Sequence, residues 1–475
     1  MDYIETEIVV IGAGPGGYTA AFYAADKGKR VILVEKNPSL GGVCLNRGCI
    51  PSKALLHAAK LIRETRESGA MGIDFGSPKL DIDKLRAWKN SVIEKLSSGV
   101  RTLAAKRNVT VITGRGYFEN SQTLRVETAE GQKFIQYQQA VLAVGSEAAM
   151  PKAFDLGNKR VMTSTEALDL SDIPDDLLII GGGYIGMELG TVYSALGSKI
   201  VLAEALPSIL TGADTDLTRP IRKFAETHFK EVRTEAKVTK MATQKNKIQV
   251  VMETGGQAKE ELYDRVLVSV GRRPNAADLG LENTKVQLDE KGFVRIDSQQ
   301  RTADPFIYAI GDIAGGVMLA HKASMEAKVA VDVICGEAAT HERVVIPAVV
   351  FTDPELAWCG LTEADAKAKG VPVRVVRFSW AASGRAMTLE RPDGMTKLVI
   401  DPASERVLGV GIVGVGAGEL ISEGVLAIEM GATAEDLASV IHPHPTLSET
   451  LMESAEAFYG TATHTFAPKR TPMEG

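Results

Sequence analysis

The sequence predicts an α/β protein in which one strand–helix–strand unit occurs twice, and three observations support this prediction. The first is the glycine pattern G-x-G-x-x-G at 12–17, which lies between an apolar run and a helical stretch. The second is the same pattern at 181–186. The third is register: each pattern leads to a strand that ends in an acid, and 169 residues separate Gly12 from Gly181 and Glu35 from Glu204. One glycine pattern is a weak signal, but two in register indicate two dinucleotide sites.

The first copy contains a predicted strand, helix and second strand, at 7–11, 19–28 and 30–35. Its glycines have different tasks. Gly12 permits the tight turn, Gly14 allows a pyrophosphate to approach the backbone, and Gly17 allows the helix to pack closely on the strand. Glu35, at the end of the second strand, can bind a ribose hydroxyl.

The second copy repeats these signals in a strand, a helix and a strand, at 177–180, 184–197 and 199–204. Later apolar runs that end at a glycine predict three more strands, at 139–146, 264–275 and 306–312. These runs are ordinary sheet core, but their glycine ends lie where a doubly wound sheet binds ligands.

Another glycine-rich stretch, 409–420, predicts a different structure. No acid-ended strand follows it at the expected distance, and the runs 395–401 and 406–413 flank the turn PASE. This arrangement is typical of a β-hairpin. We therefore expect an interface region there and no third dinucleotide site.

Length and charge restrict the remaining possibilities. A chain of 475 residues suggests about three domains. Its net charge of −6, without a basic block, argues against nucleic acid as a partner. The uncharged stretch 8–25 is broken by Pro15 and by glycine turns, so we expect no membrane span and no signal peptide. Four cysteines in this length are few, which favours the reducing cytoplasm.

Cys44 and Cys49 allow three interpretations: a metal site, a structural disulfide or a redox-active disulfide. A redox pair fits best beside a nucleotide site, because a metal needs further ligands and the cytoplasm disfavours structural disulfides. Five residues of helix rise about 7.5 Å, whereas bridged Cα atoms lie within about 6.8 Å. We therefore expect a distorted helix entry, with freedom supplied by Gly48 and with Pro51 in the first turn. The helix N-terminus should make Cys49 the sulfur of lower pKa.

The motifs GGVCLNRGCIPSK, GRRPN, AIGD, LAHKA and HPHPTLSE, with the two glycine patterns, carry a resemblance that covers nearly the whole chain. The sequence resembles the pyridine nucleotide–disulfide oxidoreductase family, in its dihydrolipoamide dehydrogenase group. The resemblance implies two Rossmann-like dinucleotide-binding domains, for FAD and NAD, with a central domain and a C-terminal α+β dimerisation domain. The implied boundaries are 1–148 for FAD, 149–276 for NAD, 277–346 for the central domain and 347–475 for the dimerisation domain with its tail.

The resemblance also implies an activity. A homodimer would reoxidise protein-bound dihydrolipoamide through the cysteine disulfide and a tightly but non-covalently bound FAD, and reduce NAD⁺. The implied partners are the lipoyl domains and acyltransferase core of 2-oxoacid dehydrogenase complexes, or the lipoyl protein of glycine cleavage. The rival enzyme is an NADPH-dependent reductase resembling glutathione reductase, and a rival of another class is a docking scaffold. Glu204 favours NAD, since a carboxylate repels a 2′-phosphate, and the intact cysteine and histidine set argues against a scaffold.

By position, six catalytic residues follow from the resemblance. Cys44 is similar to the thiol that meets the substrate, and Cys49 to the thiol that faces the flavin. Lys53 resembles the lysine near the flavin ring, with Glu188 as its partner. His444 is similar to the catalytic base and Glu449 to its partner, both supplied by the other subunit.

The resemblance assigns the acid that binds the FAD ribose to Glu35 and the side chain that covers the flavin to Tyr184. It assigns the contacts to the ribityl chain and the isoalloxazine ring system of FAD to Asp312 and Ala320. No metal is implied. The full set of implied cofactor contacts is Gly12, Gly14, Gly17, Glu35, Lys36, Gly42, Val43, Lys53, Gly116, Gly145, Asp312, Ala320, Gly181, Gly182, Gly183, Tyr184, Ile185, Gly186, Glu204, Val238, Val270 and Gly271.

Several of these residues have plain structural alternatives. The less favoured alternatives are a solvated helix lysine for Lys53, a surface charge for Glu188 and a core aromatic for Tyr184. His57 is better interpreted as a helix histidine than as a catalyst. Arg47, between the two cysteines, is a candidate for lowering a thiol pKa.

Thr446-Leu-Ser-Glu449 also fits the capping box T-x-x-E, so Glu449 is alternatively a helix cap. Both interpretations can hold, since a carboxylate has two oxygens. Cys335 and Cys359 have no near partner in sequence and are expected to be small buried hydrophobic residues.

Overall fold

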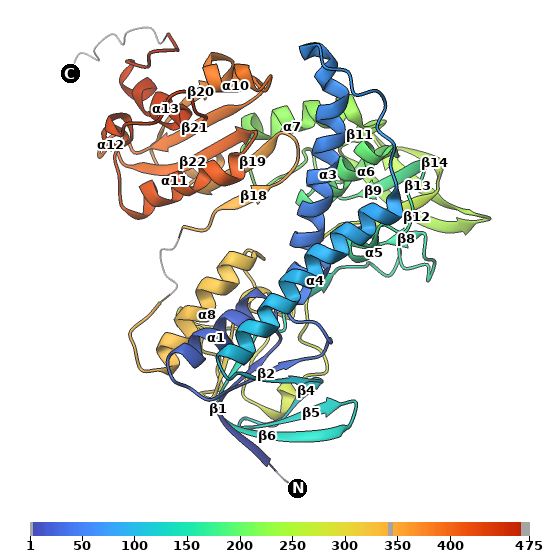
Figure 1. Cartoon of the computed structure of the whole chain (residues 1–475), viewed down its shortest axis with the longest axis vertical. Helices are drawn as coiled ribbons and strands as arrows, with labels where there is room; N and C mark the ends of the chain where they lie inside the picture. Colours follow the sequence, from blue (N-terminus) through green and yellow to red (C-terminus); the bar gives the residue numbers. More distant parts are fainter. Residues whose placement is uncertain (1–2, 341–344, 467–475) are drawn as a thin grey trace.

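The computed structural model describes residues 3–340 and 345–466 (Figure 1). The predictions for 341–344, at the end of the central domain, and for the tail end 467–475 lie outside the described residues. The predicted α/β class with two parallel-sheet units and an antiparallel C-terminal unit is confirmed.

The first unit is built on a seven-stranded sheet in which the predicted first copy forms the centre. Its order is β3-β2-β1-β6-β5-β4, and β17 pairs with β6. The strands are β1 (Tyr3–Ile11), β2 (Val31–Glu35), β3 (Thr110–Thr113), β4 (Arg115–Asn120), β5 (Thr123–Thr128), β6 (Gly131–Leu142) and β17 (Ile307–Ala309). Strand β17 lies in the predicted central domain, so the central domain contributes a strand to the first sheet.

Two helices from distant parts of the chain cover one face of this sheet side by side, α1 (Pro15–Asp26) and α8 (Ala320–Ile334) (Figure 1). Alanines of α1 and α8 pack in a core with strand residues such as Val10 and Leu33. Tyr23 donates from its hydroxyl to Asp332 Oδ1 over 2.8 Å, which joins the two helices further.

The second unit repeats this design with a five-stranded parallel sheet of order β11-β10-β9-β15-β8. Its strands are β8 (Val161–Met162), β9 (Asp176–Ile180), β10 (Lys199–Ala203), β11 (Glu231–Arg233) and β15 (Arg265–Val268). Its helices are α5 (Ser164–Asp169), α6 (Tyr184–Leu196) and α7 (Thr215–His228). A three-stranded antiparallel sheet extends it, formed by β12 (Ala236–Gln244), β13 (Lys247–Thr254) and β14 (Gln257–Tyr263).

The two units are joined by the chain segments that cross between them. These segments pair as a two-stranded antiparallel ribbon, β7 (Ser146–Ala148) with β16 (Arg272–Pro274). Asn275 strengthens the ribbon, because its backbone N–H donates to Gly145 O over 3.0 Å and its side chain donates to Val144 O over 2.9 Å.

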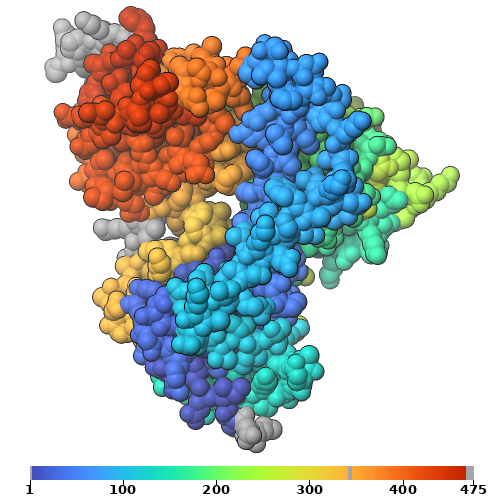
Figure 2. Space-filling model, viewed as in Figure 1, coloured from blue at the N-terminus to red at the C-terminus, as the bar shows by residue number. Residues whose placement is uncertain are grey.

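Three helices from the early part of the chain also connect the parts. They are the short α2 (Gly42–Arg47) and the long α3 (Cys49–Glu67) and α4 (Ile82–Lys106), and α4 reaches from the first unit to the second (Figures 1 and 2). Leu55 and Leu56 of α3 belong to a core that contains residues of the second unit and Val350 and Leu356 of the third. The helix that begins at Cys49 is therefore fixed by all three parts.

The third unit is an antiparallel sheet of order β18-β19-β22-β21-β20. Its strands are β18 (Ala348–Val350), β19 (Glu355–Gly360), β20 (Arg374–Ser379), β21 (Met395–Ile400) and β22 (Val407–Gly414). Its helices are α9 (Glu363–Lys369), α10 (Gly384–Thr388), α11 (Ala417–Glu429), α12 (Ala434–Ser439) and α13 (Glu449–Tyr459). The predicted hairpin is confirmed by the antiparallel pairing of β21 with β22, and the glycines of 409–420 lie in β22 and at the start of α11.

Short 3₁₀ helices complete the described structure, namely η1 (Ser68–Met71), η2 (Leu281–Asn283), η3 (Gly311–Ala314) and η4 (Trp380–Ala382). Within 3–340 and 345–466, no helix is both long enough and apolar enough to cross a membrane.

Candidate active site

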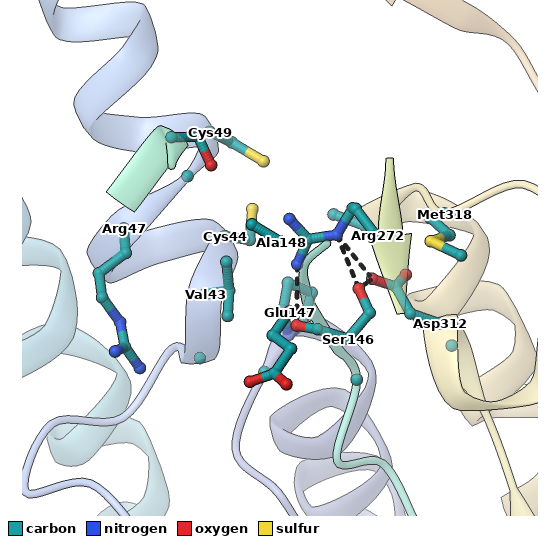
Figure 3. Close-up of a pocket in the computed structure, with 18 of the residues that line it drawn as sticks. Val43, Cys44, Arg47, Cys49, Ser146, Glu147, Ala148, Arg272, Asp312 and Met318 are labelled. Atoms are coloured by element: carbon teal, nitrogen blue, oxygen red, sulfur yellow. Dashed lines mark hydrogen bonds and ion pairs between the residues drawn. The ribbon is translucent and has the colours of Figure 1, made fainter. Parts of the chain in front are cut away.

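A cavity of about 460 Å³ lies at the carboxyl ends of β1, β6 and β17. Residues that follow these three strands line it, together with the α2–α3 junction and the start of α6. This is the edge at which a doubly wound sheet binds its ligands. Figure 3 shows the side chains of this cavity, with Cys44 and Cys49 on one side and Asp312 on the other.

The first and third glycines of both fingerprints are required by close contacts. A Cβ on Gly12 would lie 2.4 Å from Ala143 O, and a Cβ on Gly181 would lie 2.4 Å from Ser269 O. Both residues also have left-handed backbone, with φ of +97° and +107°. A Cβ on Gly17 would approach the Gly12 carbonyl to 1.8 Å. The sequence interpretation of these positions as tight-turn and helix-packing glycines is therefore confirmed.

The second glycine of each fingerprint faces open space. A Cβ on Gly14 would meet no atom nearer than 4.0 Å, and a Cβ on Gly183 would meet none within that limit. Gly14 and Gly183 are the N-caps of α1 and α6, and no side chain caps either helix. Uncapped N–H groups beside open space suit a phosphate, which the helix dipole also favours. The residues present therefore fit a pyrophosphate in both units.

The acids that end the second strand of each copy are held in the same way. Glu35 accepts hydrogen bonds from Ala13 N (2.8 Å) and Asn37 N (2.9 Å). At positions 169 residues later, Glu204 accepts from Gly182 N (2.6 Å) and Leu206 N (2.8 Å). Asn37 Nδ2 also donates to Glu35 Oε1, over 2.7 Å, so the second lone pair of Glu35 that is open to a ligand lies on Oε2. Both carboxylates are therefore fixed beside their glycine turns with acceptor capacity for a ribose hydroxyl.

The helix entry at the cysteine pair is distorted, as predicted. Helix α2 ends at Arg47, Gly48 breaks the chain direction, and α3 begins at Cys49 with Pro51 in its first turn. A Cβ at Gly48 would lie 3.0 Å from Val43 O and 3.3 Å from Cys44 Cα, so a side chain there would require these neighbours to shift. Both cysteines are free thiols.

The pKa values of the two thiols are shifted in opposite directions. The hydrogen bond from Cys44 lowers the pKa of Cys49 to about 7, and the positive charge of Lys53 helps, against the opposing effects of burial and Glu188. The same hydrogen bond and burial raise the pKa of Cys44. The sulfur of lower pKa is Cys49, as the sequence predicted. The hypothesis for Arg47 is not supported, since its side chain points away from both sulfurs and the cation that lowers the Cys49 pKa is Lys53 (Figure 3).

Behind Cys49, Lys53 forms a close ion pair with Glu188. Lys53 Nζ lies 3.0 and 2.9 Å from the two carboxylate oxygens, and the Ser52 hydroxyl donates to one of them over 2.8 Å. The backbone N–H of Phe351 donates to the other over 3.0 Å, and Lys53 Nζ lies 4.5 Å above the Phe351 ring. Glu188 is 3% exposed. The alternatives of a solvated lysine and a surface glutamate are therefore wrong.

Tyr184 lies at the other side of the cavity, at the first position of α6. It is 42% exposed, so the alternative of a core aromatic is also wrong. Ile185, the next residue, lines the same cavity.

Asp312 lies in η3 and receives a hydrogen bond from the Ser146 hydroxyl. Ser146 in turn accepts from Arg272 Nε over 2.7 Å. Ala320, the first residue of α8, lines the cavity nearby. Sequence reasoning missed Ser146 and Arg272 as site residues, although the motif GRRPN containing Arg272 was part of the resemblance.

The remaining predicted cofactor contacts fall into three groups. Those that line the same cavity are Lys36, Gly42, Val43 and Gly145. Gly116 lines a second cavity of about 450 Å³, which also reaches Glu35. In the second unit Val238 is buried in β12, whereas Val270 and Gly271 are exposed between β15 and β16.

His444 and Glu449 form a pair on the third unit. His444 Nδ1 lies 2.9 Å from Glu449 Oε1, while Thr446 N–H donates to Glu449 Oε2 over 2.7 Å. The carboxylate therefore orients the histidine with one oxygen and holds the turn before α13 with the other. The predicted capping box is not formed, because α13 begins at Glu449 itself, its N-cap is Ser448, and the Thr446 hydroxyl bonds Pro443 O and Ser448 Oγ. Burial opposes ionisation of Glu449, but these two hydrogen bonds outweigh it and lower the carboxyl pKa.

The His444 side chain is 73% exposed. It lies between α12 and α13, which Figure 1 places on the far side of the third unit from the start of α3. Within one chain, His444 therefore does not reach Cys44.

Other predicted positions are ordinary structure. His57 lies on α3 beside Trp88, with ring centroids 6.4 Å apart. Cys359 is buried at 2% exposure, as predicted, and Cys335 is only partly buried. In the part of the chain that the structure describes, no group of three or more His, Cys, Asp or Glu side chains is arranged to hold a metal ion.

Comparison with known proteins agrees with this geometry. Residues 6–327 match the family described as pyridine nucleotide-disulphide oxidoreductase, and residues 346–455 match the dimerisation domain of that family. Dihydrolipoyl dehydrogenase from Vibrio cholerae is 46% identical over 97% of each chain. The Haemophilus influenzae protein of the same name is 44% identical over 97% of this chain and 96% of its own.

Two solved structures share the fold. LpdA from Mycobacterium tuberculosis aligns with a TM-score of 0.89 at 26% identity, over 95% of this chain and 99% of its own. The flavoprotein disulfide reductase RclA from Escherichia coli, in its Cu(II) complex, aligns with a TM-score of 0.87 at 28% identity, over 96% and 100%. The chain therefore belongs to the pyridine nucleotide-disulphide oxidoreductase family and carries that family's dimerisation domain.

Proposed function

We propose that the protein is an FAD-containing, NAD⁺-dependent dihydrolipoyl dehydrogenase that acts as a homodimer. The observation that carries the proposal is the cysteine pair at the first nucleotide cavity, with a low-pKa sulfur at Cys49 beside the Lys53–Glu188 ion pair. The names of the similar proteins from Vibrio cholerae and Haemophilus influenzae support the choice of substrate.

In this proposal the turn at 12–17, Glu35 and Asp312 hold FAD, and the turn at 181–186 with Glu204 holds NAD. The proposed FAD region is 1–148 together with 277–346, the NAD region is 149–276, and 347–475 forms the dimer. When bound, FAD supplies the electron acceptor that lies between the disulfide and the nicotinamide. Tyr184, exposed at the cavity, is the proposed cover of the flavin.

Cys44 is the sulfur that takes part in thiol–disulfide exchange with the substrate. His444 of a second copy accepts the proton of a dihydrolipoamide thiol, and the resulting thiolate attacks the disulfide. Glu449 holds the imidazole and stabilises its protonated form. This assignment requires a dimer, because His444 lies far from the cysteines of its own chain (Figure 1).

The proposed partners are lipoyl domains and the acyltransferase core of a 2-oxoacid dehydrogenase complex, or the lipoyl protein of glycine cleavage. The proposed compartment is the cytoplasm, where thioredoxin and glutathione keep thiols reduced.

Glu204→Gln should weaken the use of NAD⁺ and improve the use of NADP⁺. The neutral amide removes the charge that repels a 2′-phosphate and loses one charge-assisted hydrogen bond, worth about 1.5–3 kcal/mol. We expect kcat/KM for NAD⁺ to fall about ten- to a hundredfold. Glu253→Gln, an exposed carboxylate on β13 of the same unit, is the matched control. A wild-type protein that already prefers NADPH would contradict the NAD assignment.

The proposed function is tested with purified wild-type protein. Bound flavin should give a yellow protein, and NADH should form from dihydrolipoamide and NAD⁺. Glutathione disulfide with NADPH is the comparison substrate pair. A folded protein that neither contains nor accepts FAD would overturn the proposal, and a preference for glutathione disulfide would replace it with the rival reductase.

A further inference from the structure

The ribbon that joins the two nucleotide units carries a buried hydrogen-bond chain to the active-site cavity. Ser146, at the start of β7, is 2% exposed. Arg272, on the returning strand β16, donates from Nε to the Ser146 hydroxyl over 2.7 Å and from Nη2 to the Ser146 carbonyl over 2.8 Å. Arg272 and Ser146 are 126 residues apart in sequence.

The chain continues to Asp312. The Ser146 hydroxyl donates to Asp312 Oδ2, and Arg272 Nε itself lies 3.8 Å from that oxygen (Figure 3). An arginine can only donate hydrogen bonds, and a serine hydroxyl has a single proton. The hydroxyl must therefore accept from Arg272 and direct its proton at Asp312. The guanidinium thus determines the direction of the hydroxyl, and the hydroxyl determines which carboxylate oxygen is occupied.

This arrangement leaves one oxygen of Asp312 for a ligand. Asp312 lines the cavity from η3, directly after β17. Among the hydrogen bonds within 3–340 and 345–466, Oδ2 has a partner and Oδ1 has none. A carboxylate that is fixed by one oxygen presents the other at a defined place, with no loss of rotamer entropy on binding.

We propose that Arg272 and Ser146 are positioning residues for FAD, which act through Asp312 by holding Oδ2 and presenting Oδ1 to the nucleotide. The proposal rests on the proposed function, since FAD is the ligand assigned to this cavity. Because Arg272 lies on the segment that returns from the second unit, it also ties the geometry of the FAD site to the junction between the two nucleotide units.

The test measures the dissociation constant of FAD for protein that has been stripped of flavin, by the change in flavin fluorescence. Ser146→Ala removes the hydroxyl that donates to Asp312, so the dissociation constant should rise about ten- to a hundredfold. Arg272→Met should raise it in the same direction, and Arg272→Lys should raise it less because the charge is kept. The double variant Ser146→Ala with Arg272→Met should bind FAD no more weakly than Ser146→Ala alone, because the arginine acts through the serine.

Arg265→Met is the matched control. Arg265 lies on β15 of the same crossing segment, pairs with Asp172 through two contacts of 2.7 and 2.8 Å, and is 16% exposed against 13% for Arg272. It should leave FAD affinity unchanged while it removes a paired arginine side chain of similar burial. Thermal melting of the flavin-free variants shows whether each is folded. If Arg272→Met is not folded, Arg272→Lys is used in its place.

Three outcomes are distinguishable. Unchanged FAD affinity in folded Ser146→Ala overturns the inference. Losses that add in the double variant also overturn it, because Arg272 would then contact the nucleotide independently. Failure of the wild-type protein to bind FAD overturns the proposed function instead.

Discussion

Cys44→Ser and Cys49→Ser should each lower NAD⁺-linked dihydrolipoamide oxidation by at least about three orders of magnitude, on the order of 4 kcal/mol. The substrate thiolate attacks one sulfur of the pair and displaces the other as a thiolate, and a serine oxygen can take neither part. Turnover of each purified variant, normalised to its FAD content, measures the loss. Cys335→Ser changes a partly buried cysteine outside the cavity and should retain wild-type turnover.

The same variants separate the roles of the two sulfurs. Cys44→Ser retains a hydroxyl that donates to Cys49, whose pKa is lowered to about 7 in the structure. The Cys49 thiolate beside bound flavin should give a long-wavelength charge-transfer band. A lowered thiol pKa means that the thiolate is present above it, so the band should disappear as the pH falls through about 7. Cys49→Ser should lack the band at every pH, and the opposite pattern would reverse the two assignments.

Glu449→Gln should reduce turnover by one to two orders of magnitude, about 1.4–2.7 kcal/mol, with a near-native melting temperature. The amide oxygen can still accept from Thr446 N–H and hold the turn before α13. The amide nitrogen then faces His444 Nδ1, where it gives a protonated imidazole no stabilisation. The lowered carboxyl pKa of Glu449 keeps the wild-type carboxylate ionised throughout the neutral range, so the deficit should persist across it. His444→Gln should cost more, because it removes the base itself.

The neighbouring pair offers a matched control. His442 Nε2 lies 2.8 Å from Glu423 Oε1, and the His442 side chain is 4% exposed. Glu423→Gln therefore breaks a histidine–glutamate contact on the same loop without touching His444. It should leave turnover near the wild-type value. Full turnover in Glu449→Gln would limit Glu449 to holding the turn before α13.

Mixed dimers test where His444 acts. A hybrid of one Cys44→Ser chain and one His444→Gln chain contains one intact site only if histidine serves the partner's cysteines. Such hybrids should recover about half the wild-type turnover per dimer, since a two-fold dimer has two equivalent sites. Inactive hybrids would place histidine and cysteines in the same chain.

Local sequence was enough for the features that depend on neighbouring residues. The two glycine fingerprints, their acids and the hairpin at β21–β22 all formed where predicted, because tight turns and close helix packing exclude side chains at those positions. The distorted helix entry between Cys44 and Cys49 was likewise predicted. A side chain at Gly48 would also contact the preceding turn of the chain closely.

The burial and pairing of the catalytic charges could not be predicted from composition or spacing. Glu188 is buried only because α3 and β18 close over α6, which brings Lys53 and the Phe351 N–H to its carboxylate across 135 and 163 residues of sequence. The resemblance implied that Lys53 and Glu188 are partners. How far they are buried depends on the packing of the three units against one another.

By itself, therefore, the sequence determined the two nucleotide cradles, the redox cysteine pair and the family to which the chain belongs. Tertiary structure alone decided that β17 completes the first sheet and that Arg272 reaches Asp312 through Ser146. The physical reason is the sequence distance over which each interaction acts. Glycine turns and helix caps are set by sterics and hydrogen bonds among neighbouring residues, whereas these two contacts depend on how separate sheets and helices bury their apolar faces against one another.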